Sequence, residues 1–223
     1  ELRTPLTIIK GFSETLVEDK KSLDEKTKMR FLHKISKNAD RLIMLVDDLF
    51  DLARLESQPN QLDYAKHSLQ KVLLEIKEVY ADRLDQNKQA LEISFDKEID
   101  EFFFDLNKVF QILNNLMENS FCHAVGFTRI MIRVNLSKDK EDVIFKFEDN
   151  GFGVDEKDLP HIFERFYMAD KGRSKEKPGT GLGLSIVKHI VLLHGGRIQA
   201  KNVLAGGMEV TFNLPYLKDP VKK

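Results

Sequence analysis

Three glycines alternate in the stretch Gly179-Thr180-Gly181-Leu182-Gly183-Leu184, and a segment with the apolar spacing of a helix follows it. Such a loop exposes backbone N–H groups, and the N-terminus of the following helix adds positive potential that suits a phosphate group. The stretch is not a P-loop, because the chain lacks GxxxxGKS and GxxxxGKT, and it does not follow a strand as a Rossmann fingerprint would. By itself, the pattern is also compatible with a flexible hinge.

A second polar feature lies upstream, at Asn115 and Asn119. A helix is predicted from an N-cap at Asp105 to about His123, and residues four apart share one face of it. Neutral amide oxygens on such a face suit Mg²⁺, which takes hard oxygen ligands and is shared with substrate phosphates. Alone, the pair is better explained as two polar surface residues.

The stretch Asp149-Asn150-Gly151-Phe152-Gly153 comes directly after a predicted strand. A carboxylate there can accept a hydrogen bond from an adenine amino group, while the two glycines let the backbone approach the ring closely. The same residues also occur in ordinary Asp/Gly turns. Further along, Phe163 and Phe166 precede a polar, basic loop predicted over 168–180, and we expect both rings to pack in a core.

The N-terminal part of the chain has a purely helical pattern. Residues 25–57 are predicted to form one long helix, and residues 1–19 a shorter helix with a weaker form of the same spacing. Two amphipathic helices bury little apolar surface alone, so we expect this α-hairpin to pair with a second copy as a dimeric four-helix bundle through residues 1–58. Packing on the neighbouring domain is the alternative. The heptad seam of the long helix comprises Leu32, Ile35, Ala39, Leu42, Val46, Leu49 and Ala53.

Beyond residues 57–61, which are typical of a linker, the pattern becomes mixed α/β. We therefore predict an α+β protein, whose second domain is an α/β sandwich with a mostly antiparallel sheet. The predicted parts are a helical hairpin (1–58), a linker (59–66), the α/β domain (67–218) and a tail (219–223). In that domain helices are predicted over 68–88, 105–123, 159–166 and 182–194, and strands over 91–95, 130–136, 143–147, 197–202 and 208–214.

Composition argues against several functions. The 223 residues carry a net charge of -1, so no large basic field attracts nucleic acid or anionic lipid. The single Cys122 cannot form an intrachain disulfide, which fits a reducing compartment such as the cytoplasm. No apolar run approaches the roughly 20 residues that span a bilayer, so we expect no membrane contact by this chain. The chain begins at Glu1 without Met, and we interpret it as a fragment of a longer protein.

Together and in this order, the four stretches resemble the N, G1, F and G2 boxes of sensor histidine kinases. The opening residues Glu1-Leu2-Arg3-Thr4-Pro5-Leu6 resemble the end of that family's H box, His-Glu-Leu-Arg-Thr-Pro-Leu. The resemblance covers essentially the whole chain. It implies a dimerisation and histidine-phosphotransfer hairpin, followed by an ATPase domain of the Bergerat (GHKL) type with a mixed, mostly antiparallel sheet. It also implies the cytoplasmic part of a bacterial sensor.

The function implied by the resemblance is that of an ATP-dependent protein-histidine kinase in a two-component system. The γ-phosphoryl group of ATP would pass to a histidine just before Glu1, and then to an aspartate in the receiver domain of a response regulator. Glu1 is implied to orient that histidine, and Thr4 to serve a phosphatase activity toward the regulator. Asn119 matches the Mg²⁺ ligand. The other residues matched to ATP binding are Asn115, Asp149, Gly151, Gly153, Gly179, Thr180, Gly181, Leu182 and Gly183.

The chain departs from the family pattern at Cys122 and His123, where Lys and Tyr are usual, and at Met168, where Arg is common. Two side chains that commonly approach phosphates are thus missing, and losing a charge-assisted contact costs about 1.5–3 kcal/mol. We therefore expect a weaker nucleotide affinity than is usual in the family. The cations available to replace them are Arg165, Lys171, Arg173, Lys175 and Lys177.

Two other functions stay open. The departures at Cys122 and Met168 also fit a nucleotide-binding scaffold without kinase activity. A gyrase-like or chaperone ATPase would need a catalytic Glu near Asn115, and Glu118 lies on the wrong helical turn for that role.

Overall fold

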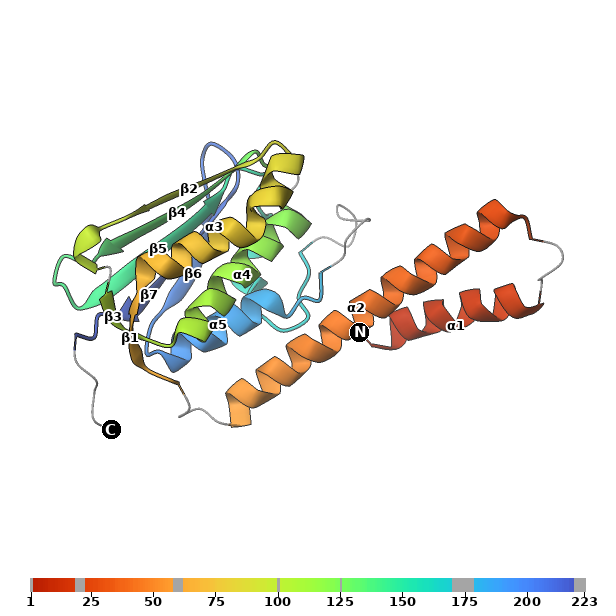
Figure 1. The fold of residues 1–223 in the computed structure, drawn as a ribbon, viewed down its shortest axis with the longest axis horizontal. Coiled ribbons are helices and arrows are strands. Elements are labelled where there is room, and N and C mark those ends of the chain that lie inside the picture. The colour runs from red at the N-terminus through yellow and green to blue at the C-terminus, as the bar shows by residue number, and fades with distance from the viewer. Residues whose placement is uncertain are drawn as a thin grey trace. The chain divides into compact units, whose positions relative to one another are not determined.

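The computed structural model describes residues 2–18, 23–57, 62–99, 101–124, 126–169 and 179–218. The chain divides into two compact units, Glu1–Arg54 and Leu55–Lys223 (Figure 1). Among the described residues, no helix combines the length and the apolar character needed to cross a membrane.

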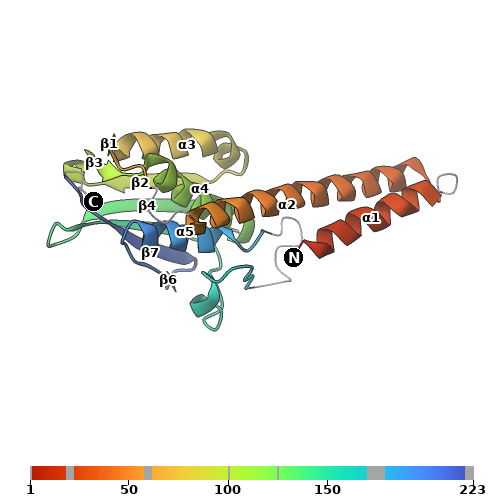
Figure 2. The same ribbon diagram turned by 90° about the horizontal axis from the view of Figure 1, so that it is seen from below.

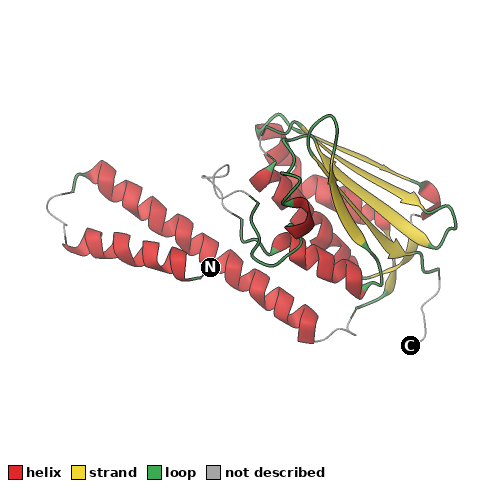
Figure 3. Ribbon diagram, turned by 180° about the vertical axis from the view of Figure 1, so that it is seen from behind, coloured by secondary structure: helices red, strands yellow, loops and turns green. Residues whose placement is uncertain are grey.

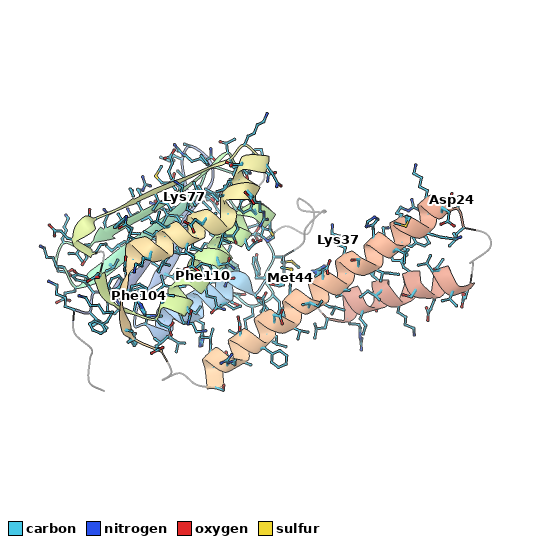
Figure 4. All side chains as sticks on the ribbon, viewed as in Figure 1. Asp24, Lys37, Met44, Lys77, Phe104 and Phe110 are labelled. Atoms are coloured by element: carbon cyan, nitrogen blue, oxygen red, sulfur yellow. The ribbon has the colours of Figure 1, made fainter. Side chains whose placement is uncertain are left out.

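The first unit is a helical hairpin, as its heptad spacing predicts. Helix α1 (Arg3–Glu18) runs antiparallel beside α2 (Glu25–Ser57), and the last residues of α2 belong to the second unit (Figures 1 and 2). The rings of Phe12 and Phe31 pack with their centroids 4.8 Å apart. Asp24 precedes α2 and accepts a hydrogen bond from the Thr27 backbone N–H at 2.6 Å, which caps one free donor of the helix (Figure 4).

The apolar seam of α2 is only partly covered within one chain. Leu32 is 50% exposed, and Val46 and Leu49 are also exposed. Other large apolar side chains of this helix that are exposed are Met29, Ile43, Met44 and Phe50. Two helices in contact can bury only their facing stripes, so a single hairpin leaves much of this apolar surface in water.

The second unit is a three-helix layer on a five-stranded sheet. The strands are β2 (Ala90–Phe95), β4 (Arg129–Leu136), β5 (Asp142–Asp149), β6 (Ile198–Asn202) and β7 (Met208–Pro215), in the order β2-β4-β5-β7-β6. Only the β2–β4 pair is parallel, so the sheet is mixed and mostly antiparallel, as predicted. One face is covered by α3 (Leu69–Gln86), α4 (Leu106–His123) and α5 (Gly183–Leu193), as Figures 1 and 3 show.

The core lies between these two layers because both carry apolar residues at the period of their own element. In β5, Val143, Phe145 and Phe147 point inward at every second position, and the Phe145 ring stacks on Phe212 of β7 at 4.6 Å. Helix α4 buries residues at spacings of three and four, which are Val109, Ile112, Leu113, Leu116, Met117 and Ser120.

The sequence predictions missed one small sheet. Strands β1 (Ala65–Ser68) and β3 (Glu101–Phe104) pair antiparallel, and Phe103 of β3 also bridges to Leu217. Each strand has only four residues, too few to show a clear alternation, so only long-range pairing reveals them. Phe104 is part of the core beside α3 (Figure 4).

The helix predicted over 159–166 is wrong. Only a 3₁₀ turn, η2 (Leu159–His161), forms there. The backbone N–H of Glu164 bonds to the His161 carbonyl at 2.8 Å, so the chain continues as three-residue turns and not as α-helix. Of the loop predicted over 168–180, residues 170–178 lie outside the described residues.

Candidate functional site

Helix α4 presents the two asparagines of the candidate site. Asp105 caps the helix as predicted, because its side chain accepts a hydrogen bond from the Lys108 backbone N–H at 3.0 Å. Asn115 and Asn119 are both half-buried on this helix. The Nδ2 atom of Asn115 is buried and has no hydrogen-bond partner in the described part of the chain. A buried amide without a partner is costly, so this end of the site is suited to receive polar atoms of a ligand.

These amides fit a magnesium–phosphate group by their chemistry. Mg²⁺ takes oxygen ligands, and an amide can turn to present either its oxygen or its nitrogen. Asn119 follows Asn115 by four residues, so both lie on one face of α4. The described residues contain no cluster of three or more His, Cys, Asp or Glu side chains that could hold a metal ion by themselves.

Asp149 ends β5 at a position that continues the buried alternation of the strand. The side chain is 3% exposed and accepts a hydrogen bond from the Gly151 backbone N–H at 3.0 Å. Burial raises the pKa of the Asp149 carboxyl, while the hydrogen bonds from Gly151, Met208 and Ser120 oppose that rise. A buried carboxylate with unused lone pairs can recognise a donor such as an amino group.

The first glycine loop is held in place by Asn202, at the end of β6. The Asn202 amide accepts a hydrogen bond from the Val154 N–H at 2.9 Å and donates one to the Val154 carbonyl at 2.6 Å. Gly153 has a φ of +73°, and a Cβ there would lie 2.7 Å from Asn202 Oδ1, so only glycine fits. Gly151 is equally restricted, because a Cβ there would lie 2.9 Å from the Ala124 Cβ. Sequence reasoning missed Asn202, which belongs to no local motif.

The second glycine loop leads into α5. Gly181 has a φ of +74°, and its carbonyl accepts a hydrogen bond from the Phe166 N–H at 2.8 Å. Thr180 is buried, and its hydroxyl accepts a bond from the Leu182 N–H at 3.2 Å. The Leu182 side chain is fully buried, so its role in the site is to anchor the loop. Gly183 begins α5, and a Cβ there would meet nothing within 4 Å.

The structure corrects the prediction for Phe166 near this loop and shows the surroundings of Arg165 and His123. Phe166 is 41% exposed with a φ of +60°, so its predicted core position is wrong; its backbone, not its ring, holds the loop. Arg165 is exposed and forms an ion pair with Glu56, which belongs to the same compact unit. His123 lies against the loop, since a Cβ on Gly179 would lie 2.8 Å from its Nε2.

The remaining predicted residues belong to the first unit or lie outside the described part of the chain. Thr4 is exposed on α1 in the first unit. Glu1 is outside the described residues, as are the loop cations Lys171, Arg173, Lys175 and Lys177.

Two family models match the chain. Residues 1–58 match the His Kinase A (phospho-acceptor) domain. Residues 104–218, more than half of the chain, match the histidine kinase-, DNA gyrase B-, and HSP90-like ATPase family. The chain belongs to the sensor histidine kinase family. The ATPase match contains every residue of the candidate nucleotide site described above, from Asn115 to Gly183.

Two longer sensor proteins are similar to almost the whole chain. The chain is 30% identical to the sensor histidine kinase WalK of Bacillus subtilis, over 98% of its own length and 36% of that protein. It is also 30% identical to the sensor protein KdpD of Clostridium acetobutylicum, over 96% of the chain and 23% of that protein. The chain thus spans about a third or less of the length of these relatives.

Solved structures share the fold. The Acinetobacter baumannii histidine kinase AdeS superposes with a TM-score of 0.72 at 26% identity, covering 97% of each chain. The histidine kinase ThkA, solved in complex with the response regulator protein TrrA, superposes with a TM-score of 0.76 at 22% identity. That match covers 100% of this chain and 60% of the ThkA chain, and at this identity it supports the fold alone.

Proposed function

We propose that this chain is the catalytic core of an ATP-dependent protein-histidine kinase. The observation that carries the proposal is the order of the two domains along the chain. A region that matches the phospho-acceptor domain is followed by a unit that matches the ATPase family. That unit contains the buried Asp149, two constrained glycine loops and the asparagine face of α4. In this reaction the bond between the γ-phosphorus and its bridging oxygen breaks and a phosphorus–nitrogen bond forms on a histidine directly before Glu1. ADP leaves with the electron pair, and the phosphoryl group then passes to a receiver aspartate.

The residues of the second unit would act mainly by positioning the nucleotide. Asp149 would accept a hydrogen bond from the adenine amino group, and the Gly179–Gly183 loop would offer backbone donors to phosphates at the start of α5. Asn119, with Asn115 beside it, would hold Mg²⁺, which neutralises charge on the phosphate oxygens when bound. Arg165 would add a cation once released from Glu56.

The hairpin would supply the acceptor and the dimer. The seam residues exposed on α2 support a homodimer through residues 1–58, in which a second copy covers the apolar stripe. Glu1 would orient the acceptor imidazole. Thr4 is exposed on α1, where its hydroxyl is accessible to a response-regulator receiver domain, and we assign to it the regulator phosphatase activity. This reaction uses ATP, so we place the chain in the cytoplasm.

The test uses a longer chain that includes the residue before Glu1, incubated with γ-labelled ATP. A phosphohistidine gives label that survives base and is lost in acid. Replacing the upstream histidine by Gln and, separately, Asp149→Asn should each abolish the label. Asp139→Asn, in the exposed turn after β4, is the matched control and should retain it.

The alternative is an ATP-binding scaffold without autophosphorylation, favoured by Cys122 and Met168 where basic side chains are usual. It predicts that the longer chain binds ATP and acquires no label. Label that persists after replacement of the upstream histidine would also contradict the kinase proposal.

A further inference from the structure

The backbone of Phe166 is held in a conformation that a bulky side chain disfavours. Its φ is +60°, in the left-handed region, and its ring is exposed, so burial of the side chain gives little compensation. A residue in this region costs free energy and persists only where its surroundings fix it. The contacts that fix Phe166 are therefore of interest for the neighbouring site.

The left-handed backbone of Phe166 lies directly against the second glycine loop. The Phe166 N–H donates a hydrogen bond to the Gly181 carbonyl at 2.8 Å. A Cβ on Gly181 would lie 2.9 Å from both the Cα and the carbonyl carbon of Phe166, so the two backbones leave no space for a side chain between them. The position of Gly181 in its loop thus depends on the position of Phe166.

A hydrogen bond between two side chains holds the segment that contains Phe166. The hydroxyl of the next residue, Tyr167, donates to Oδ1 of Asp158 at 2.7 Å, and Asp158 is only 7% exposed. Between these residues the chain runs through short turns, in which the His161 N–H donates to the Asp158 carbonyl at 2.9 Å and the Tyr167 N–H to the Glu164 carbonyl at 3.3 Å. Three-residue turns have poor hydrogen-bond geometry, whereas a hydroxyl bonded to a carboxylate is among the stronger pairs. The Tyr167 side chain is therefore the firmest attachment beside Phe166.

We propose that Tyr167 is a positioning residue for the phosphate groups of ATP, which acts through Phe166 and Gly181. The inference rests on the proposed ATP-binding function. The Tyr167 hydroxyl fixes the Phe166 backbone, and that backbone sets the orientation of the Gly179–Gly183 loop before α5. Without the hydroxyl the loop can turn its N–H groups away from the phosphates, so ligands that carry phosphates should bind less tightly.

The first glycine loop has a support of its own. Asn202 of β6 accepts from the Val154 N–H at 2.9 Å and donates to the Val154 carbonyl at 2.6 Å. The loop proposed for the base is thus attached to the sheet, whereas the loop proposed for the phosphates is attached to the turns that end at Tyr167. Loss of the Tyr167 hydroxyl should therefore affect the phosphate end of the nucleotide and leave recognition of the base unchanged.

The experiment compares ATP with adenosine, which has the same base and no phosphate. Dissociation constants for the full chain are measured by calorimetry for ATP and by NMR titration for adenosine. Tyr167→Phe keeps the ring and removes only the hydroxyl. We expect it to weaken ATP binding about fivefold, the size of one net hydrogen bond, and to leave adenosine binding unchanged. Tyr216→Phe is the matched control, because it removes a hydroxyl that donates to the Glu98 carbonyl at 3.0 Å, and it should change neither constant.

A mutant cycle with Asp158 tests whether the hydroxyl acts through its hydrogen bond. Asp158→Leu removes the acceptor, so adding Tyr167→Phe to it should weaken ATP binding no further. Asp158→Asn keeps an acceptor oxygen and should retain more of the ATP affinity than Asp158→Leu. A second loss of about fivefold in the double variant would show that the hydroxyl acts by another route, and the inference would be wrong.

Two results for Tyr167→Phe would overturn the inference and leave the proposed function intact. One is unchanged ATP binding, which would show that the hydroxyl does not hold the loop. The other is an equal loss for ATP and adenosine, which would indicate a general loosening of the unit. Absence of ATP binding by the unmodified chain would overturn both the inference and the proposed function. Thermal melts establish that each variant is folded at the temperature of the titration.

Discussion

The two units of this chain differ in how completely they bury their apolar side chains. In the second unit Phe145 is fully buried between sheet and helices, and its ring stacks on Phe212. In α2 of the hairpin, Phe50 is 66% exposed, and the seam residues Leu32 and Leu49 are exposed as well. A sheet covered by three helices encloses its own core, whereas two helices leave an uncovered stripe.

The two units therefore derive their stability from different contacts. The α/β unit is stabilised by contacts within one chain, and its site is built on that rigid core. In the proposed dimer a second copy covers the apolar surface of the hairpin, so we expect the stability of the hairpin to depend on protein concentration. The two units should therefore respond differently to the same kind of substitution.

The largest expected contrast is between two phenylalanine truncations. Phe145→Ala should lower the free energy of unfolding of the α/β unit by about 3–5 kcal/mol, because it leaves a cavity in a closed core. Phe50→Ala should change the stability of the monomeric hairpin by less than about 0.5 kcal/mol. Urea denaturation followed by circular dichroism measures both. A loss of several kcal/mol for Phe50→Ala in the monomer would show that this side chain is buried in solution.

A charged residue in the α2 seam tests whether the hairpin forms the proposed dimer. Val46→Asp would bury a carboxylate in the proposed dimer interface and should raise the dimer dissociation constant by at least about thirtyfold, or about 2 kcal/mol. Sedimentation equilibrium measures the change. Lys37→Asp is the control, because Lys37 lies at the heptad position opposite the seam (Figure 4), and it should leave the dimer intact. Unchanged mass for Val46→Asp would place the interface elsewhere.

A comparison of the helix caps tests the same contrast at a smaller scale. Asp105 is buried and accepts from Lys108 N–H and from Asp63 N–H, both at 3.0 Å. Asp105→Ala should cost about 1–2 kcal/mol, since two backbone donors lose their partner. Asp24→Ala, at the exposed start of α2, should cost less, because water replaces the lost acceptor. Thermal melts rank the two, and a larger loss for Asp24→Ala would contradict the ranking.

The smallest expected effect is a pH dependence of stability that comes from His194. This residue is buried after α5 against Tyr64; its Nδ1 bonds to the Ile190 carbonyl at 2.8 Å, and its Nε2 has no partner in the described chain. Burial lowers the pKa of His194, an effect that Lys108 adds to and that Asp105 and the Ile190 bond oppose. In the unfolded chain the pKa of His194 is about 6.5. Below that pH the unfolded chain binds a proton on His194 that the folded chain does not bind.

Stability should therefore fall as pH is lowered from 7.5 to 5.5, by at most about 1.4 kcal/mol in total from this group. His194→Asn, whose amide can still donate to Ile190, should show a flatter profile over the same range. His33→Asn, on the exposed surface of α2, should keep the original slope. Denaturation midpoints at each pH measure the profiles, and parallel profiles for His194→Asn and the unmodified chain would contradict the assignment.

Much of the fold was predictable because its signals are local. The heptad spacing predicted the bounds of α2, and the Asp105 cap predicted the start of α4, since both depend on residues within one or two turns. The alternation of β4 and β5 was equally visible, with a polar Asp149 in the buried phase of β5. The glycine stretches predicted the two loops at which a Cβ is excluded at Gly153 and Gly181.

Other features appear only once the chain has folded. Strands β1 and β3 are too short to be recognised separately, and η2 replaces a predicted helix because three-residue turns satisfy its backbone there. The exposure of Phe166 follows from its left-handed backbone, which no spacing rule anticipates.

Residue periodicity alone thus determined a two-part α+β chain with an apolar seam along α2 and glycine loops suited to phosphate. Tertiary structure decided which polar groups meet. It placed Asn202 against Val154, although the two residues are far apart in sequence. The physical reason is that periodicity records which face of an element is buried, whereas the partner on that face depends on the packing of helices on the sheet.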